Sequence, residues 1–259
     1  PLCVYVFLFL SSSLPSLLVF WSGQDMTVLY QWWWAIHGST LSFAYFHPTD
    51  TFDFVRNFEL LFSASMSQIW YLLGVSIFLV WVFLYSSTQF RAVFGNIRLI
   101  RLMNYLGVYV IGIIAAMFVG VTQGIFSPLT LISIIVGGIA LCCAWIFSVA
   151  TNDLVDVPID RITNPTRPLV MGTLAREEMK HVAMLSGMWT ILGGGALGSY
   201  GCFFVLVFLC IYATYSLPPL RLKRVPVLAS FLIAVAHLVS MMLGFFLVSS
   251  ARMLSDFPQ

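Results

Sequence analysis

Segment 151–160, which reads TNDLVDVPID, gathers carboxylates in a chain that has few of them. Asp153, Asp156 and Asp160 are three of the ten acidic residues in the 259-residue sequence. On a helix, which turns about 100° per residue, they share an arc of roughly 100° with Asn152. Oxygen ligands on one face can bind a hard cation such as Mg²⁺, which takes one or two carboxylates together with substrate phosphate oxygens.

Without a cation, these carboxylates repel one another and oppose the dipole at a helix C-terminus, at roughly 0.3–1 kcal/mol per exposed charge. The alternative is a solvated acidic face neutralised by Arg161 and Arg167, and the spacing alone does not decide between the two. Pro158 lacks an N–H and clashes with the carbonyl of Leu154 in a straight helix, which predicts that Asp160 lies beyond a kink. The loop RITNPTRPLVMGTLAREE then adds cations, which favours a magnesium-bound diphosphate.

A second polar segment, YATYSLPPLRLKR, occupies residues 212–224 after a later apolar run. Its two prolines end a helix, Tyr215 and Ser216 offer hydroxyls at that end, and Lys223 is one of three basic residues that follow. A basic loop on the inner side of a membrane accounts for these charges equally well. The spacing leaves both interpretations open.

The composition places both segments in a membrane protein. Of the 259 residues, 60% are hydrophobic and 8% are charged, whereas soluble proteins carry roughly 25% charged residues. A membrane-spanning helix needs roughly 20 mostly apolar residues. The sequence therefore predicts an all-α fold, a polytopic transmembrane helix bundle with spans at 2–20, 68–88, 104–124, 129–150, 181–199, 201–216 and 227–250.

The basic residues give these spans an orientation. When the spans alternate across the membrane, Arg56 and Arg252 fall on one side and the other ten of the twelve Lys and Arg residues fall on the opposite side. Because cytoplasmic loops carry an excess of Lys and Arg, the side with ten basic residues and the acidic motif is expected to be cytoplasmic. Residues 21–67 then form an outer loop whose aromatic residues suit a membrane–water interface.

The chain is expected to comprise two regions. Residues 1–90 form an N-terminal membrane region of unknown role, with two spans and the aromatic outer loop, and residues 91–259 carry the two polar segments. The five cysteines lie in apolar runs without C-x-x-C spacing, and the four histidines are dispersed. Neither a disulfide framework nor a zinc site is expected from this pattern.

Three blocks of the sequence resemble motifs of one enzyme family. NDLVDVPID followed by NPTRPLVMG resembles the first aspartate-rich motif of the UbiA superfamily of intramembrane prenyltransferases. YSLPPLRLKR is similar to the tyrosine-serine-proline motif of that family. IRLIRLMNYLGVYVIG resembles its first helix, in which Arg101 and Asn104 match an Arg and an Asn that face the active-site cavity. The blocks follow the family order across residues 96–250, about three fifths of the chain.

The resemblance implies a helical bundle around a cavity that opens to lipid, in which Mg²⁺ bridges aspartates to an allylic polyprenyl diphosphate. Loss of diphosphate leaves an allylic cation, which an aromatic or lipid acceptor attacks. The implied catalytic residues are Asp153, Asp156 and Asp160, which with Asn152 also hold the metal. The residues implied to contact the diphosphate or shape its pocket are Arg101, Asn104, Arg161, Arg167, Tyr215, Ser216 and Lys223. The expected partners are these substrates and membrane lipids, without nucleic acid.

The sequence departs from the family pattern at its end. The family has a second aspartate-rich motif some two helices after the tyrosine-serine block, and ARMLSDFPQ ends the chain before it. About five of nine family helices are present, which predicts part of an enzyme and puts the activity of this chain alone in question. Two other interpretations remain, a transporter that uses the acidic cluster and a non-catalytic lipid-binding membrane protein. The acidic group lies at the end of a span beside a basic loop, which favours the enzyme.

Overall fold

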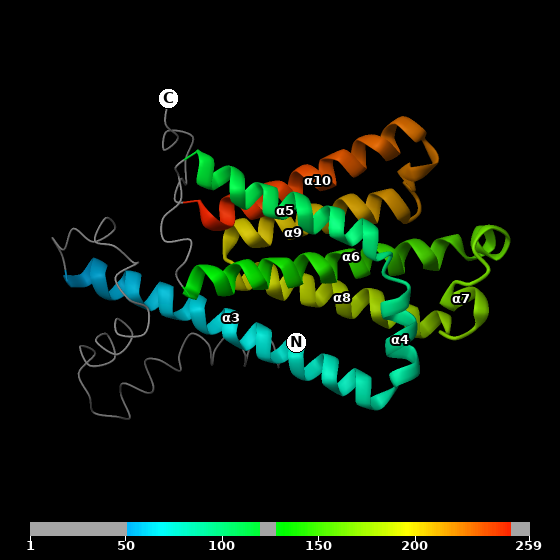
Figure 1. Cartoon of the computed structure of the whole chain (residues 1–259), viewed down its shortest axis with the longest axis horizontal. Helices are drawn as coiled ribbons and strands as arrows, with labels where there is room; N and C mark the ends of the chain where they lie inside the picture. The colour runs from blue at the N-terminus through cyan, green and yellow to red at the C-terminus, as the bar shows by residue number, and fades with distance from the viewer. Residues whose placement is uncertain (1–50, 120–127, 250–259) are drawn as a thin grey trace.

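The computed structural model describes residues 51–119 and 128–249, with side chains described from 64 to 119 and from 130 to 249. The elements in these ranges are all helical (Figure 1), which confirms the all-α prediction. In chain order they are α3 (Thr51–Tyr85), α4 (Ser87–Gly95), α5 (Leu99–Phe118), α6 (Pro128–Thr163), α7 (Pro168–Met171), α8 (Arg176–Ala196), α9 (Ser199–Ser216), the short 3-10 helix η3 (Leu222–Arg224) and α10 (Pro226–Val248).

Five helices in the described part of the chain are long and apolar enough to cross a membrane. They are Ala64–Tyr85 of α3, all of α5, Thr130–Thr163 of α6, α9 and α10, which correspond to five of the seven predicted spans. The predicted span 181–199 largely coincides with α8, which is not among the five; its first turn carries Glu177 and Glu178. The predicted span 2–20 lies outside the described residues.

One predicted boundary is wrong. Helix α3 begins at Thr51, so residues 51–67 are helical instead of part of an outer loop, and residues 21–50 lie outside the described ranges. Helix α6 continues to Thr163, so the helix that contains the predicted span 129–150 also carries the acidic motif. A 36-residue helix is about 54 Å long and exceeds the roughly 30 Å hydrocarbon core, so a polar C-terminal part of α6 extends past the apolar stretch.

This extension changes the setting of the acidic motif. Pro158 lies inside α6, and the helix continues through it, so Asp160 shares one helix with Asn152 and Asp153. Only Asp160 is near the C-terminal turn, which means that the helix dipole opposes Asp160 far more than Asp153.

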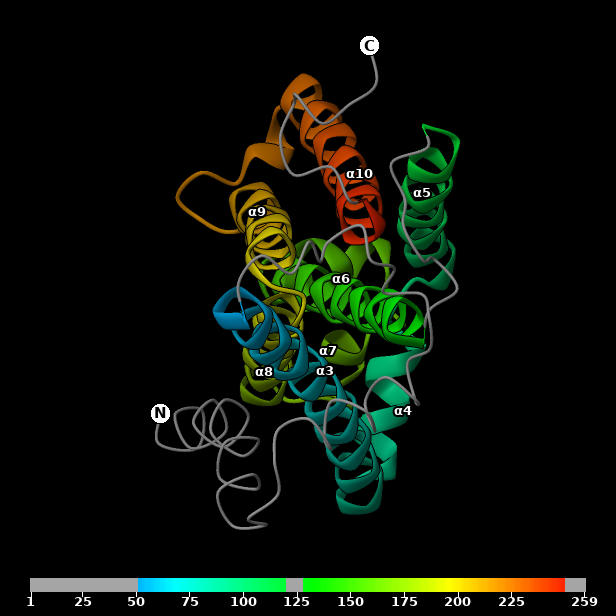
Figure 2. The ribbon, with the colours of Figure 1, turned by 90° about the vertical axis from the view of Figure 1, so that its left-hand side faces the viewer.

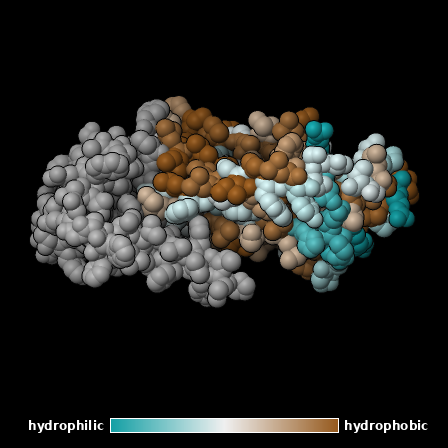
Figure 3. All heavy atoms as spheres, turned by 90° about the horizontal axis from the view of Figure 1, so that it is seen from below, coloured by the Kyte–Doolittle hydropathy of each residue, from teal (hydrophilic) through white to brown (hydrophobic). Residues whose placement is uncertain are grey.

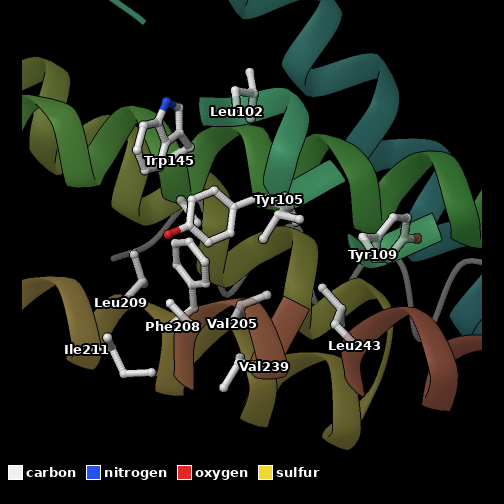
Figure 4. Packing of buried hydrophobic residues seen from close by; sticks show 14 of the residues in the cluster. Leu102, Tyr105, Tyr109, Trp145, Val205, Phe208, Leu209, Ile211, Val239 and Leu243 are labelled. Carbon is white, nitrogen blue, oxygen red and sulfur yellow. The ribbon is translucent and has the colours of Figure 1, made fainter. Parts of the chain in front are cut away.

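Helix α6 lies in the middle of the bundle, with α8 and α9 on one side and α5 and α10 on another (Figures 1 and 2). Aromatic residues from several helices fill the core between them (Figure 4). The rings of Tyr105 and Phe208 meet edge to face with centroids 5.5 Å apart, and those of Tyr105 and Trp145 lie 5.2 Å apart. Trp145 also donates a hydrogen bond from Nε1 to the carbonyl oxygen of Ile97 at 2.5 Å, which ties α6 to the residues just before α5.

Glycines allow the closest helix crossing, between α5 and α10. A Cβ atom at Gly112 would lie 2.0 Å from the carbonyl oxygen of Met241, and one at Gly244 would lie 2.1 Å from that of Tyr109. Backbone atoms cannot move aside as a flexible side chain does, so any larger residue must push the helices apart. Small residues at such crossings are the usual route to close packing in membranes.

Gly112→Ala is therefore expected to lower the free energy of unfolding by about 1–3 kcal/mol, the range for overpacking a filled interior. The matched control is Gly107→Ala on the same helix, where a Cβ would meet nothing within 4 Å. It should leave stability equal to or slightly above that of the wild type, since Ala favours a helix over Gly by about 1 kcal/mol. Unfolding in mixed micelles, followed by circular dichroism, measures both. Equal stability of the two variants would contradict the close crossing.

The N-terminal helix α3 packs on the rest of the bundle. Its Tyr71 and Val75 form a buried cluster with Val136 of α6 and Ala196 of α8, and Tyr71 meets the ring of Trp189 edge-on at 5.9 Å. The predicted boundary at residue 90 falls within α4. These contacts pack the described part of residues 1–90 against residues 91–259. They do not test the division of the chain into these two regions, which stays a prediction.

Among the residues that the structure describes, the outer surface of the bundle is largely apolar except at the end where α7 lies. Residues such as Ile77, Phe118 and Val227 are 68–88% exposed, as suits contact with lipid. Figure 3 shows apolar residues over the middle of the molecule and hydrophilic residues towards the end at which α7 lies. The connections α4–α5, α6–α8 and α9–α10 lie at that end, and the Lys and Arg residues whose side chains the structure describes lie in these connections or in the helix turns beside them. The chain is an integral membrane protein, and many polar side chains of its described part gather at one end.

Candidate active site

Helix α6 brings the four residues of the acidic motif to the polar end and divides them between two edges. At about 100° per residue, Asn152 and Asp156 lie about 40° apart around the helix, and Asp153 and Asp160 about 20° apart. The first pair contacts residues at and after the end of α9, and the second contacts residues from the α4–α5 connection and from the segment before α7. The single cluster expected from the sequence is therefore two neighbouring pairs with different partners.

Asp153 is 2% exposed, and both of its carboxylate oxygens accept hydrogen bonds. Asn96 donates from Nδ2 to Oδ2 at 2.6 Å, and Arg98 donates from Nη2 to Oδ1 at 2.8 Å. Arg167 also pairs with Oδ1. Arg98 precedes α5 in the left-handed region, with φ 57°, a conformation uncommon for a residue with a side chain. The ion pair to Asp153 stabilises this arrangement.

Asp160 joins the same network, and each of its two carboxylate oxygens has one partner. Its Oδ2 lies 3.4 Å from Arg167 Nη1, and its Oδ1 accepts a hydrogen bond from Asn164 Nδ2 at 3.0 Å. Burial lowers the pKa of Arg167 to about 10, and the charge of Arg98 acts in the same direction. Arg167 remains charged at neutral pH, so two cations face the buried carboxylate of Asp153.

The other pair faces the segment after α9. Asp156 accepts from Arg221 Nη2 at 2.6 Å and from Lys223 Nζ at 2.5 Å, through different oxygens. Asn152 Oδ1 accepts from the same Lys223 ammonium at 2.8 Å and from Ser216 Oγ at 3.5 Å. Burial lowers the pKa of Lys223, and the charge of Asp156 opposes that shift. Two oxygens one helical turn apart thus converge on one cation, which is the donor chemistry that a hard metal ion requires.

The oxygens present fit a metal only in part. No group of three or more His, Cys, Asp or Glu side chains gathers as a metal centre in the described part of the chain. The Asp153 oxygens are engaged by Asn96, Arg98 and Arg167, which leaves Asn152 and Asp156 as the pair arranged around one cation. Because Mg²⁺ keeps waters and takes substrate phosphate oxygens, two protein ligands are compatible with it.

A cavity of about 360 Å³ lies directly inside this polar end. Five residues predicted for the site line it, namely Arg101, Asn104, Asn152, Tyr215 and Ser216. They come from α5, α6 and α9, and α10 closes the cavity with Ile233 and His237. The remaining predicted residues lie outside this lining, and of these Asp153, Asp156, Asp160, Arg167 and Lys223 belong to the ion-pair networks just described.

Arg161 is the predicted site residue that the fold sets apart. It lies nine positions after Asn152, about 180° around the helix, which turns it to the opposite side of α6. Its side chain is exposed, and it makes no ion pair with any residue that the structure describes. Its expected role in neutralising the carboxylates therefore falls to Arg98, Arg167, Arg221 and Lys223.

The aromatic wall of the cavity was not anticipated. Tyr105, Trp145 and Tyr212 line it together with His237. His237 donates from Nδ1 to the carbonyl oxygen of Ile233 at 2.8 Å, and its ring stacks on Tyr105 with centroids 4.2 Å apart. Helical spacing could have indicated the three aromatic residues. Tyr105 lies four positions from Arg101, Trp145 seven positions from Asn152, and Tyr212 four positions from Ser216. No sequence signal marked His237.

A second, more open hollow of about 700 Å³ adjoins the cavity at the α4–α5 connection. Arg98 and Arg101 line both spaces, and Arg91 and Arg167 line the second one. Asn96 and Asn164 add amide groups to its wall. Four cationic side chains (Arg98, Arg167, Arg221 and Lys223) thus pair with the three carboxylates of α6, and Arg101 adds a fifth positive charge beside them. The net positive charge favours an anionic ligand at this end.

Comparisons with known proteins find similarity to prenyltransferases. A family model described as the UbiA prenyltransferase family matches residues 109–255, more than half of the chain. The chain is 35% identical over 115 residues to naringenin 8-dimethylallyltransferase 2 of Sophora flavescens, covering 42% of this chain and 28% of that protein. It is 32% identical over 121 residues to homogentisate phytyltransferase of Synechocystis, covering 47% of this chain and 39% of that protein.

A third relative is the bacteriochlorophyll synthase 33 kDa chain of Cereibacter sphaeroides, 32% identical over 107 residues, which cover 41% of this chain and 34% of that protein. The chain thus spans less than two fifths of the length of these curated relatives. No solved structure matches it significantly. Arg101 and Asn104 lie just before the residues that the family model matches.

Proposed function

Since this chain belongs to the UbiA prenyltransferase family, we propose that it carries out, or forms part of an enzyme that carries out, prenyl transfer within the membrane. The donor is an allylic polyprenyl diphosphate and the acceptor an aromatic compound. One observation carries the proposal: Arg101, Asn104, Asn152, Tyr215 and Ser216 converge from three helices on one cavity, beside the cation-binding pair Asn152 and Asp156. The names of two relatives refer to naringenin and homogentisate, which are aromatic compounds, and this supports an aromatic acceptor.

Asn152 and Asp156 are the residues that we propose to hold Mg²⁺. A bound divalent ion supplies positive charge that neutralises the departing diphosphate. The guanidinium groups at the polar end supplement it, because planar Arg side chains bind phosphate oxygens in pairs. Arg101 lines both the cavity and the adjoining hollow, so it can hold the diphosphate where the two spaces meet.

The aromatic wall suits the second half of the reaction. When the bond between the allylic carbon and the diphosphate oxygen breaks, its electron pair leaves with diphosphate and an allylic cation remains. Tyr105, Trp145 and Tyr212 present rings to the cavity, and each ring can stabilise a nearby cation by about 0.5–2 kcal/mol. The acceptor ring carbon then forms the new bond with a pair of its π electrons and loses its proton to a base such as the released diphosphate.

We assign Asp153 a different part from the one its motif implied. Its oxygens hold Arg98 and Arg167, which face the hollow next to the cavity. Asp153 therefore acts as a positioning residue for two diphosphate-binding cations, and Asp160 assists through Arg167. In this arrangement the motif supplies both the metal ligands and the anchors of the basic groups.

The direct test is prenyl transfer by the protein in nanodiscs. Dimethylallyl diphosphate and longer allylic diphosphates serve as donors, with naringenin and homogentisate as acceptor probes. We expect product in the presence of Mg²⁺ and none with EDTA, as measured by mass spectrometry. Thermal stabilisation by Mg²⁺ with inorganic diphosphate is a second readout, which a bare lipid-binding scaffold would not show. Absence of both transfer and stabilisation would contradict the proposal.

A transporter fits the site less well. Transporters place their sites near the bilayer midplane on broken helices, whereas α6 is continuous and its carboxylates lie at the polar end in ion pairs. We also propose that this end faces the cytoplasm, as its basic connections favour. Labelling of Lys180 by an impermeant amine reagent from the cytoplasmic side alone checks the orientation.

A further inference from the structure

Lys223 lies where the proposed metal ion would bind. Its ammonium nitrogen is 2.8 Å from Asn152 Oδ1 and 2.5 Å from Asp156 Oδ2. These are the two oxygens that α6 offers to one cation. The Lys223 side chain is 14% exposed, so it is inserted between them and does not extend into solvent.

The neighbours of Lys223 show that this placement is specific. Arg221 takes the other carboxylate oxygen of Asp156, at 2.6 Å. Arg224, the next residue along the chain, is exposed and makes no ion pair within the described ranges. A loop that was merely basic would present its three cations alike, whereas here two occupy one carboxylate and the third does not.

The same segment is built to move more easily than the helices that flank it. Residues 218–220 are exposed, and η3 contributes no buried residue. A segment that buries little surface opens at a low free energy compared with a packed helix. The contacts of Arg221 and Lys223 with α6 are therefore a main attachment of the loop to the site.

We propose that Lys223 is an internal cation that occupies the metal site of the metal-free protein, and that a divalent ion displaces it. An ammonium group and a metal ion cannot share Asn152 Oδ1 and Asp156 Oδ2, because both need the same oxygens and repel each other at such distances. Metal binding and release of the 217–225 segment are thus linked, each favouring the other. The freed ammonium is then available to the diphosphate. This inference rests on the proposed function for the identity of the metal site.

The sequence provides a direct measurement, because Lys180 and Lys223 are its only lysines. Lys180 is 48% exposed, and its ion pair is with Glu177 on α8, so it serves as an internal reference. The protein in nanodiscs is acetylated briefly with limiting reagent, and the two sites are quantified by mass spectrometry. Without divalent ions, Lys223 should react several-fold more slowly than Lys180. Mg²⁺ alone should raise the rate at Lys223 several-fold and leave Lys180 unchanged, whereas NaCl of equal ionic strength should change neither.

Two matched variants separate displacement from general electrostatics. Asp156→Asn should make Lys223 react quickly before any Mg²⁺ is added and remove the response to Mg²⁺. Glu177→Gln should affect Lys180 alone. In Mn²⁺ titrations followed by electron paramagnetic resonance, Lys223→Gln should bind the ion several-fold more tightly than Arg224→Gln does, although both remove one positive charge from the same loop.

The outcomes are distinguishable from those of the activity test. Labelling of Lys223 that Mg²⁺ leaves unchanged or lowers would overturn the displacement, whether or not the protein transfers prenyl groups. Equal Mn²⁺ affinity of the Lys223 and Arg224 variants would overturn it as well. Labelling that responds to Mg²⁺ in a protein that shows neither prenyl transfer nor thermal stabilisation by Mg²⁺ with diphosphate would remove the proposed function and leave the displacement standing.

Discussion

Asp156→Asn is expected to lower the rate of Mg²⁺-dependent prenyl transfer by about 10²-fold or more. Asp156 supplies the carboxylate of the pair that we propose to hold the metal, and its oxygens converge with Asn152 on one cation. Removing one group that stabilises charge in a reaction step typically lowers kcat by about 10²–10³-fold. The rate is measured with saturating donor in nanodiscs, across a range of Mg²⁺ concentrations.

Glu177→Gln is the control for this variant, since it removes an acidic side chain at the same end of the molecule whose only described ion pair is with Lys180 on the surface. It should retain wild-type activity. The melting temperature of each variant shows whether a loss of activity reflects unfolding. Unchanged Mg²⁺-dependent activity in Asp156→Asn would contradict the assignment of the metal site.

Asp153→Asn is expected to act mainly on stability, lowering the free energy of unfolding by about 3 kcal/mol. Breaking a buried ion pair by removing one partner costs about 3–5 kcal/mol, because the other charge stays buried. Here two guanidinium groups, Arg98 and Arg167, lose their common carboxylate. We take the lower end of the range because the Arg98 side chain keeps 24% exposure. Unfolding in mixed micelles, followed by circular dichroism, measures the loss.

Asp160→Asn is the comparison for this variant. Its distance to Arg167 is 3.4 Å and it retains the contact with Asn164, so its loss should destabilise the protein clearly less. A stable Asp153→Asn variant that no longer binds Mg²⁺ would show instead that Asp153 is a metal ligand. The variants at 153 and 156 therefore separate an anchoring carboxylate from a metal-binding one, although the motif presents them as equivalent.

Much of the fold could be predicted from the sequence because lipid imposes simple demands. An apolar run of about 20 residues must be helical in a bilayer, since its backbone groups have no water to bind. For this reason five of the predicted spans correspond to long apolar helices of the structure. The length of an apolar run does not show where a helix ends when the helix continues into polar sequence. Helix α6 continues past its apolar part to Thr163, and α8 begins with charged residues before the predicted span.

The sequence by itself determined that Asn152, Asp153 and Asp156 share one side of a helix, because the helical repeat places them there whatever surrounds them. Only the tertiary structure decided that the helix continues past Pro158 to Asp160 and that the four residues divide into two pairs. An arc of roughly 100° is wide enough for its edges to face different neighbours, and those neighbours lie far along the chain. Asn96 reaches Asp153 from 57 positions away, and Lys223 reaches Asp156 from 67. Such contacts depend on how α5, α6 and α9 pack, which local spacing cannot express.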